Sequence, residues 1–374
     1  MVDQYVETTT KSWGSRILSS ITGVFIGILI FFASFYVLFW NEGRTDLSEI
    51  AKKSVEISSK SLTNSENDNE LISVTGTLQS NEKIGDDFIK KGDYISLNRN
   101  VEMYAWVEKK SSKSKKNLGG SETTETTYTY AQEWTSSPQN SSNFKIQEEH
   151  ENPLMSTGGD SRSVQGANVG IYNLSFNQIN LPKGTPLLLN NSNTILNGND
   201  FSLANSNYLF SGKGTLAQPQ VGDVKISYSA ISNPLNTATV FGKLNLKNKQ
   251  IVPYYSQKNN KIYRVFEGNK EGAIIKMKNE YKTALWIVRA VGFIMMWLGL
   301  MMLFGPISVL LDVLPILGSI SRGGFSIVSF LVSLILSVIT IVVSIVLHSL
   351  IALAIIVFST LVIFIILYLL KSKK

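Results

Sequence analysis

The sequence predicts a multi-pass α-helical membrane protein with four spans, one N-terminal and three C-terminal, and a large central antiparallel β-rich (α+β) soluble domain. Uncharged apolar runs lie near both ends of the 374 residues, and polar residues fill the middle. Each apolar run is long enough for a hydrocarbon core of ~30 Å. The middle alternates with the period of two that is typical of strands. This segregation is typical of a membrane protein with an aqueous domain.

The first predicted span covers residues 17–40, which carry no charge. At ~1.5 Å per residue this run crosses the hydrocarbon core with some tilt. It is longer than the apolar core of a signal peptide, so we expect a retained helix. The segment Trp40-Asn41-Glu42-Gly43-Arg44 follows. Trp40 suits the interfacial aromatic belt, Gly43 a helix C-cap, and Arg44 contact with headgroups.

The remaining spans are predicted at residues 286–311, 325–347 and 349–370. We expect Pro306 to kink the first of these helices, because proline disrupts the helical hydrogen-bond ladder. Residues 312–324 contain proline and glycines and predict a short cytoplasmic turn. Residues 325–370 are twice the length of one span, so they predict a tight helical hairpin that turns at His348-Ser349.

Four spans place both termini on one face of the membrane. Basic residues near the spans predict that residues 1–16 and the tail 371–374 are cytoplasmic and that residues 41–285 lie on the luminal or periplasmic side. The supporting residues are Lys11, Arg16, Arg322, Lys371, Lys373 and Lys374. Basic residues that flank the spans on the other face oppose this assignment: Arg44, Lys52, Lys53, Lys282 and Arg289.

The central domain is predicted to be an antiparallel β structure. Val101 to Val107 alternates apolar and polar residues, and Thr126 to Trp134 is rich in Thr and Tyr. The charged segment from Lys109 to Thr127 between them predicts a hairpin tip. Gly76-Thr-Leu78 and Gly214-Thr-Leu216 are each followed by Gly-Asp and a strand pattern, which hints at two similar halves.

Several motifs together resemble the transmembrane protein 43 (LUMA) family. The first is Trp40-Asn41-Glu42-Gly43-Arg44, which closes the first span. Others follow in the family's order: Val101 to Glu108, Tyr128 to Trp134, Asn152-Pro153, Val221 to Val224, and Arg289-Ala-Val-Gly292. The resemblance covers most of the chain. It implies four spans and a large domain in the lumen of the endoplasmic reticulum or nuclear envelope.

The resemblance also carries expectations about partners. Animal members are implicated in organising the inner nuclear membrane, through complexes with lamins and emerin and through self-association. Bacterial members lack those partners. The abundance of Lys, Asn, Ile and Ser favours a bacterial or other microbial member, with the domain in the periplasm of an inner membrane. The family has no established enzymatic residues, so no catalytic site is carried over.

Direct inspection for chemistry predicts no enzyme, no cofactor and no metal site. The absence of cysteine excludes disulfides and thiol chemistry. His150 lies among Glu148, Glu149 and Glu151. It lacks a second nitrogen ligand for a metal, so we expect a solvated acidic loop. No phosphate-binding loop or nucleophile elbow occurs. The net charge of +7 is better explained by lipid contact than by nucleic acid.

Small and hydroxylated residues within the spans are the remaining candidates. Gly23 and Gly27 form a small-xxx-small pair, which favours dimerisation or packing within the bundle. A stripe of hydroxyl side chains follows one face of the third span: Ser326, Ser329, Ser333, Ser337, Thr340 and Ser344. We expect this stripe to serve close helix packing. The alternative is a polar conduit for ions or small solutes.

These observations predict a non-enzymatic scaffold that organises its membrane or envelope. We expect contact with the lipid bilayer, assembly into a homo-oligomer, and an unidentified protein partner that binds the β domain. Two alternatives stay open at this point. The third span could form a channel or transporter, or a metal-dependent hydrolase could be built around His150.

Overall fold

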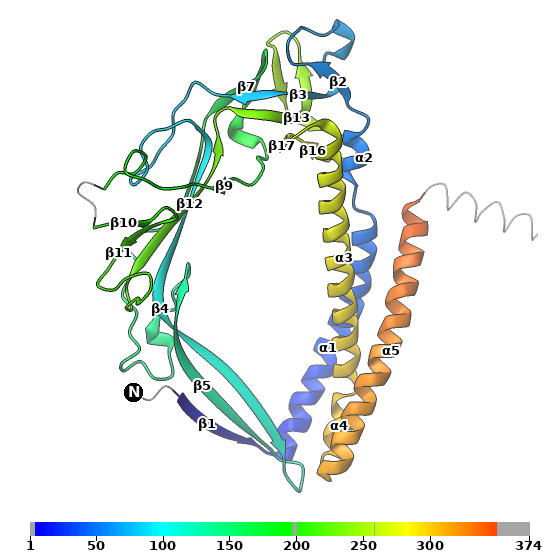
Figure 1. Ribbon diagram of the computed structural model, residues 1–374. Coiled ribbons are helices and arrows are strands. Elements are labelled where there is room, and N and C mark those ends of the chain that lie inside the picture. The colour runs from blue at the N-terminus through cyan, green and yellow to red at the C-terminus, as the bar shows by residue number, and fades with distance from the viewer. Residues whose placement is uncertain (1–3, 197–199, 258, 350–374) are drawn as a thin grey trace, which may run out of the picture. The chain divides into compact units, whose positions relative to one another are not determined.

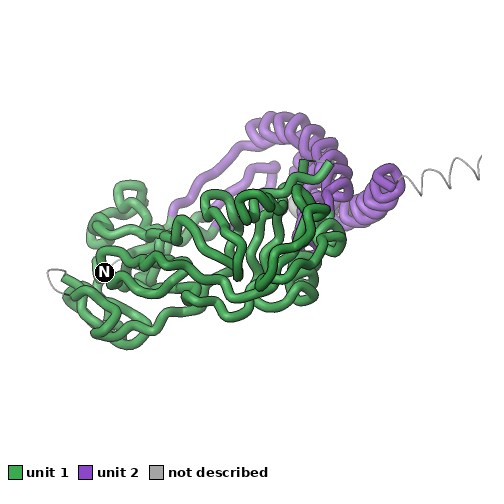
Figure 2. Tube along the Cα trace, turned by 90° about the horizontal axis from the view of Figure 1, so that it is seen from above, with its two compact units in different colours: residues 1–6, 46–111, 126–279 green, residues 7–45, 112–125, 280–374 purple. Residues whose placement is uncertain are grey.

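The computed structural model describes residues 4–196, 200–257 and 259–349. The chain divides into two compact units (Figure 2). Unit 1 contains residues 1–6, 46–111 and 126–279, and unit 2 contains residues 7–45, 112–125 and 280–374. Unit 1 holds most of the β domain. Unit 2 holds the apolar helices together with the tip of one β-hairpin.

The described part of unit 2 is built on four helices (Figure 1). These are α1 (Trp13–Glu42), α3 (Lys270–Leu303), which begins in unit 1, α4 (Gly305–Leu311) and α5 (Pro315–His348). Ser12 caps α1 by accepting a hydrogen bond from the Ser15 amide at 3.3 Å. Three described helices are long and apolar enough to cross a membrane, within Trp13–Ala51, Lys270–Leu303 and Ile320–His348. The predicted fourth span, 349–370, lies outside the described residues apart from Ser349, so the expected count of four is not supported.

The connection between the second and third membrane helices is shorter than the predicted turn. Helix α3 ends at Leu303, and Pro306 lies in the first turn of α4 instead of kinking a continuous helix. Proline is tolerated there because the first helical amides have no partner within the helix. Helix α5 likewise has a proline in its first turn and begins at Pro315. Only residues 312–314 therefore separate α4 from α5. The glycines at 318, 323 and 324 do not break it.

Two large sheets form the β domain. The first has the order β1-β5-β4-β12-β11-β10, with β6 beside β4 and β9 beside β12. Its strands are β1 (Gln4–Lys11), β4 (Tyr94–Lys116), β5 (Glu122–Thr135), β6 (Asp160–Ser163), β9 (Thr185–Pro186), β10 (Ser202–Asn205), β11 (Tyr208–Ser211) and β12 (Val224–Ser232). The predicted alternation is confirmed at the start of this run in β4, where Val101, Met103 and Ala105 are buried, but it ends there, because Trp106 is buried and Val107 is half-buried. The hairpin tip falls between β4 and β5, as predicted.

The second sheet closes on itself. Its strands are β2 (Val55–Ser58), β3 (Leu71–Gln79), β7 (Gly166–Val169), β8 (Tyr172–Ser175), β13 (Leu235–Asn245), β14 (Gln250–Val252) and β17 (Arg264–Glu267). Strand β13 pairs with both β14 and β3, so β13, β14, β8, β7 and β3 form a ring. Two pairs, β2–β3 and β14–β8, are parallel. Outside this sheet, unit 1 also contains the short helix α2 (Leu47–Ala51) and the pair β15 (Tyr254–Tyr255) and β16 (Lys261–Ile262).

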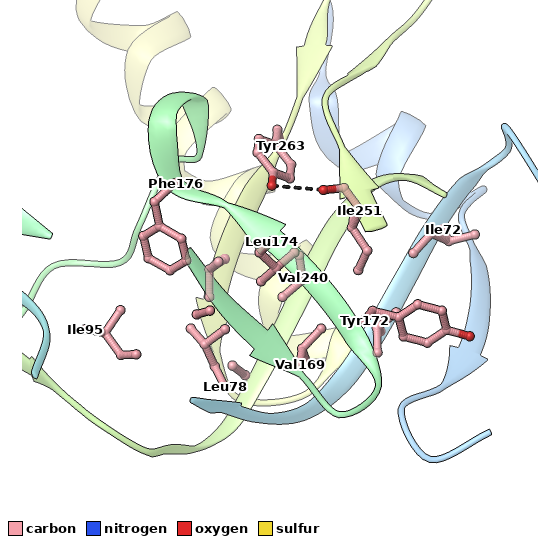
Figure 3. Close-up of a cluster of buried hydrophobic side chains, with 14 of the residues drawn as sticks. Ile72, Leu78, Ile95, Val169, Tyr172, Leu174, Phe176, Val240, Ile251 and Tyr263 are labelled. Carbon is pink, nitrogen blue, oxygen red and sulfur yellow. Dashed lines mark hydrogen bonds between the residues drawn. The ribbon is translucent and has the colours of Figure 1, made fainter. Parts of the chain in front are cut away.

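Apolar side chains from this ring form the main core of unit 1 (Figure 3). Val74, Val169 and Val240 are fully buried in it. Tyr172 and Tyr263 are its tyrosines, and the hydroxyl of Tyr263 lies 3.0 Å from the carbonyl oxygen of Ile251 and 2.9 Å from that of Ser175. Burial raises the pKa of Tyr263 to about 12, although its hydrogen bond with Ser175 works in the opposite direction. The phenol therefore stays neutral and satisfies buried backbone groups.

The structure does not support the predicted two similar halves. Gly76 to Leu78 lies within strand β3, whereas Gly214 to Leu216 lies in the loop between β11 and β12. Gly214 lies in a turn held by Asp223, whose carboxylate accepts hydrogen bonds from the amides of Lys213 and Gly214. The likeness in sequence thus reflects shared use of glycine, not a shared local structure.

Candidate functional site

The segment from Trp40 to Arg44 lies where α1 ends, and it joins α1 to α3. Glu42 accepts two hydrogen bonds from the Arg289 guanidinium, from Nε at 2.8 Å and from Nη2 at 2.7 Å. The fully buried Asn41 donates from Nδ2 to the Leu285 carbonyl oxygen at 3.1 Å. A bidentate arginine–carboxylate pair fixes both distance and orientation. The predicted motif is therefore a joint between two membrane helices.

Aromatic rings surround this joint. Arg44 lies 5.7 Å from the centroid of the Trp40 ring, and Arg289 lies 4.7 Å from that of Trp286. Gly43 ends α1 with φ −82°, which any residue adopts. Its lack of a side chain makes room for α5, because a Cβ there would lie 2.5 Å from His348 Nε2. The glycine predicted as a C-cap is thus required for space and not for its backbone angle.

The Glu42–Arg289 pair predicts a loss of stability when its charge is removed. Glu42→Gln is expected to lower the free energy of unfolding by about 2 kcal/mol, because two charge-assisted hydrogen bonds are weakened where the carboxylate is 3 % exposed. Thermal unfolding in detergent measures the change. Glu49→Gln is the matched control, since Glu49 pairs with Lys52 in the solvent and its loss should change the stability far less. Equal losses for both variants would contradict the role of the joint.

The two glycines of the predicted pair on α1 have different surroundings. A Cβ at Gly27 would lie 2.7 Å from Met302 Cβ and 2.9 Å from the Gly299 carbonyl oxygen. A Cβ at Gly23 would meet only the end of Met302, at 4.0 Å. Gly27 and Gly299 therefore let α1 and α3 approach closely. Of the two uses predicted for this pair, packing within one chain accounts for Gly27.

The hydroxyl stripe of α5 lies against other helices of unit 2. Ser329, Ser333, Ser337 and Ser344 are buried in the bundle. Ser337 and Ser344 donate to carbonyl oxygens of their own helix, those of Leu334 at 3.0 Å and Thr340 at 2.6 Å. The remaining two members are half-buried: Thr340 donates to Leu336, and Ser326 lies 3.8 Å from Met301 Sδ. The self-bonded hydroxyls of Ser337, Thr340 and Ser344 favour close packing over a conduit. The buried hydroxyls of Ser329 and Ser333 have no hydrogen-bond partner among the described residues.

A charged cluster that the sequence did not predict lies at the other end of α1. Arg16 is 6 % exposed and pairs with Asp312, which is fully buried, and with Glu122 at 2.9 Å. Arg322 also pairs with Asp312, at 2.6 Å. Lys116 pairs with Glu122 and lies 4.0 Å from Asp312. No local pattern links residues 116 and 122 to the helices, so sequence inspection missed them.

The hairpin tip fits against the helix ends through backbone contacts as well. Trp13 Nε1 donates to the Val309 carbonyl oxygen at 3.0 Å, and the Gly119 amide donates to Val313 at 3.2 Å. Arg16 donates to the carbonyl oxygen of Gly120. Gly119 and Gly120 have φ of +84° and +81°, a region that disfavours side chains, and a Cβ at Gly120 would collide with Trp13.

The pKa values of both Glu122 and Lys116 are lowered in this cluster, which favours the charged form of the first and disfavours that of the second. Burial raises the pKa of Glu122, but the hydrogen bond from Lys116 and the charges of Lys116 and Arg16 outweigh it, so the pKa falls below its usual value. Burial also lowers the pKa of Lys116, and the charges of Arg16 and Arg322 lower it further. The cluster borders a cavity of about 340 Å³ within unit 2. Positive charge is in excess there.

His150 lies in an aromatic cluster of unit 1 and is 1 % exposed, so the expectation of a solvated residue is wrong for the histidine, whereas Glu148, Glu149 and Glu151 are exposed as expected. Its ring stacks on Tyr130 at 4.0 Å and meets the edge of Trp106 at 4.6 Å. Both ring nitrogens lack a hydrogen-bond partner among the described residues. No group of three or more potential metal-ligating side chains occurs in the described part of the chain. The imidazole therefore packs as an aromatic ring.

The family model of Transmembrane protein 43 matches residues 103–350, which run from strand β4 through helix α5. The chain belongs to this family. It is 26 % identical to Transmembrane protein 43 of Mus musculus over 344 residues, which cover 85 % of this chain and 82 % of that protein. The Homo sapiens relative is also 26 % identical, over 361 residues that cover 88 % and 86 %. No solved structure matches the chain. As a Transmembrane protein 43 relative with long apolar helices, the chain is an integral membrane protein.

Proposed function

We propose that the protein is a non-enzymatic scaffold that organises its membrane by self-association, and that its β domain binds a partner on the non-cytoplasmic side. The charged residues at both ends of α1 support a structural role over an enzymatic one. Glu42, Arg289, Arg16 and Asp312 are engaged in ion pairs that join structural elements. A bacterial inner membrane with a periplasmic domain is our favoured location. The endoplasmic reticulum or inner nuclear membrane applies if the source is eukaryotic.

The observation that carries the proposal is the open edge of the first sheet. Strand β10, Ser202–Asn205, pairs with β11 on one side only, as far as the described residues extend. Its sequence, Ser-Leu-Ala-Asn, carries no charge and no proline, and the edge it offers is four residues long with a shift in register between Leu203 and Asn205. Free backbone amides and carbonyls at such an edge pair with a strand of another chain. A second copy of the protein supplies the occupant for self-association.

The mass of the purified chain in detergent, with Ala204→Pro alongside, tests this. Light scattering is expected to show a discrete oligomer for the unchanged chain and a smaller species for the variant. The pairing register skips Ala204 between Leu203 and Asn205, so proline there removes an amide without breaking the pairing with β11.

Ala217→Pro is the matched control, because Ala217 is an exposed alanine in a loop. The control is expected to retain the oligomer. A monomeric unchanged chain would refute self-association. An oligomer that survives Ala204→Pro would show that β10 is not the contact, and the partner of the β domain would then be sought by affinity capture.

A further inference from the structure

The cavity beside Arg16 is lined by more positive than negative side chains. Its cationic residues are Lys11, Arg16, Lys116 and Arg322, and its carboxylates are Glu122 and Asp312. Asp312 is already paired with two guanidinium groups, and Glu122 with Arg16 and Lys116. Both carboxylates are therefore neutralised within the protein. The excess of two positive charges is available to an anion.

Two of the four cations face outward. Lys11, at the end of β1, is exposed. The Arg322 side chain is 37 % exposed and uses Nη1 to contact Asp312. By contrast, Arg16 is 6 % exposed and is committed to Asp312, Glu122 and the Gly120 carbonyl oxygen. The buried arginine thus shapes the cavity, and the outer Lys11 and Arg322 are the groups that meet a ligand.

Apolar side chains also line the cavity. They are Met301, Val309 and Phe325, and Ser308 and Ser326 lie among the lining residues as well. These residues come from the end of α3, from α4 and from the start of α5, where apolar helices give way to charged residues. A site lined by both basic and apolar groups matches a lipid, whose charged phosphate is joined to acyl chains.

We propose that this cavity binds the phosphate of an anionic membrane lipid, with Lys11 and Arg322 as its main contacts. Burial and repulsion by Arg16 and Arg322 lower the pKa of the Lys116 ammonium, although the hydrogen bond with Glu122 and its charge act in the opposite direction. A phosphate group nearby would offset that repulsion. The volume of the cavity, about 340 Å³, lies within the range that small-molecule sites occupy.

The proposed site can form only if the hairpin tip and the start of α1 lie on the same face of the membrane. Lys116 and Glu122 come from the tip, and Lys11 and Arg16 come from the start of the chain. Thr10 and Thr123 support this closeness, since their hydroxyls lie 3.3 Å apart. The absence of cysteine makes sidedness measurable with single introduced thiols.

The experiment compares lipid retention by the full chain in detergent, using native mass spectrometry with phosphatidylglycerol or phosphatidylcholine. We expect preferential retention of phosphatidylglycerol. A basic residue near anionic lipid contributes a factor of about five, so Lys11→Gln with Arg322→Gln should weaken retention about twenty-five-fold. Lys11→Gln alone leaves the Asp312 pairs intact and should weaken it about five-fold. Lys282→Gln, which removes an exposed charge from α3, is the matched control and should change nothing.

Equal retention of the two lipids, or retention that the double variant does not change, would overturn the proposal. Stabilisation by inorganic phosphate that lipid cannot enhance would identify a soluble phosphate as the ligand and overturn the lipid assignment. A second arm places Leu118→Cys and Gly14→Cys in separate chains and labels vesicles with an impermeant maleimide. Labelling from the same side supports the site, and labelling from opposite sides refutes it.

Discussion

Arg16→Met is expected to lower the free energy of unfolding by about 3 kcal/mol, the low end of the cost of breaking a buried ion pair. The loss follows from three contacts that end together, those with Asp312, Glu122 and the Gly120 carbonyl oxygen. Asp312 is fully buried, so each cation that it loses leaves its charge less compensated. Arg322 remains beside it, which keeps the expected loss from being larger.

Thermal unfolding in a mild detergent measures this effect, and Arg44→Met is the control. Arg44 contacts Trp40 at the other end of α1 through a cation–π interaction, which is worth about 1 kcal/mol or less where it is exposed. Similar losses for the two variants would mean that the tip cluster contributes no more than a surface contact. Limited proteolysis at the hairpin tip adds a local measurement, since the tip should be cleaved faster in Arg16→Met.

Gly27→Ala is expected to destabilise the helix bundle by about 1–3 kcal/mol, the usual cost of an added methyl group in a filled core. The new Cβ meets Met302 Cβ and the backbone oxygen of Gly299, and backbone cannot rotate away. Gly23→Ala, four residues earlier, meets only the flexible end of Met302. That variant should be neutral or slightly stabilising, because alanine favours a helix over glycine by about 1 kcal/mol.

Thermal unfolding of both glycine variants, together with their masses in detergent, separates packing within the chain from association between chains. Destabilisation at Gly27 with an unchanged oligomer is the expected pattern. A folded Gly27→Ala chain that has lost its oligomer would instead assign this glycine to contact between copies. Equal behaviour of the two variants would contradict the close approach of α1 and α3 at Gly27.

Local patterns predicted the parts of the structure that depend on neighbours in the chain. The uncharged run at 17–40 predicted α1, and the alternation from Val101 predicted β4, because helices and strands impose their periods on nearby residues. Local patterns overestimated the turn after α4, since proline in a first helical turn starts a helix as readily as it ends one.

Contacts between distant segments were beyond those patterns. Glu42 and Arg289 are separated by 247 positions, and Arg16 and Gly120 by 104. Neither pair has a spacing that one helix or strand would impose. The burial of His150 was also beyond local patterns. Its acidic neighbours predicted that the side chain would be exposed to solvent, whereas Trp106 and Tyr130 enclose it. The closed ring of the second sheet likewise depends on β3 and β13, which are far apart in the sequence.

The docked hairpin tip constrains how the chain enters its membrane. Helix α1 has 30 residues, about 45 Å at ~1.5 Å per residue, which exceeds a hydrocarbon core of ~30 Å. The chain leaves α1 at Glu42, yet the tip returns to Arg16 at the opposite end. The strands that lead to the tip carry Lys109, Lys110, Lys113 and Lys115, and hydrocarbon cannot solvate such charges. Their route must be lined by water or protein.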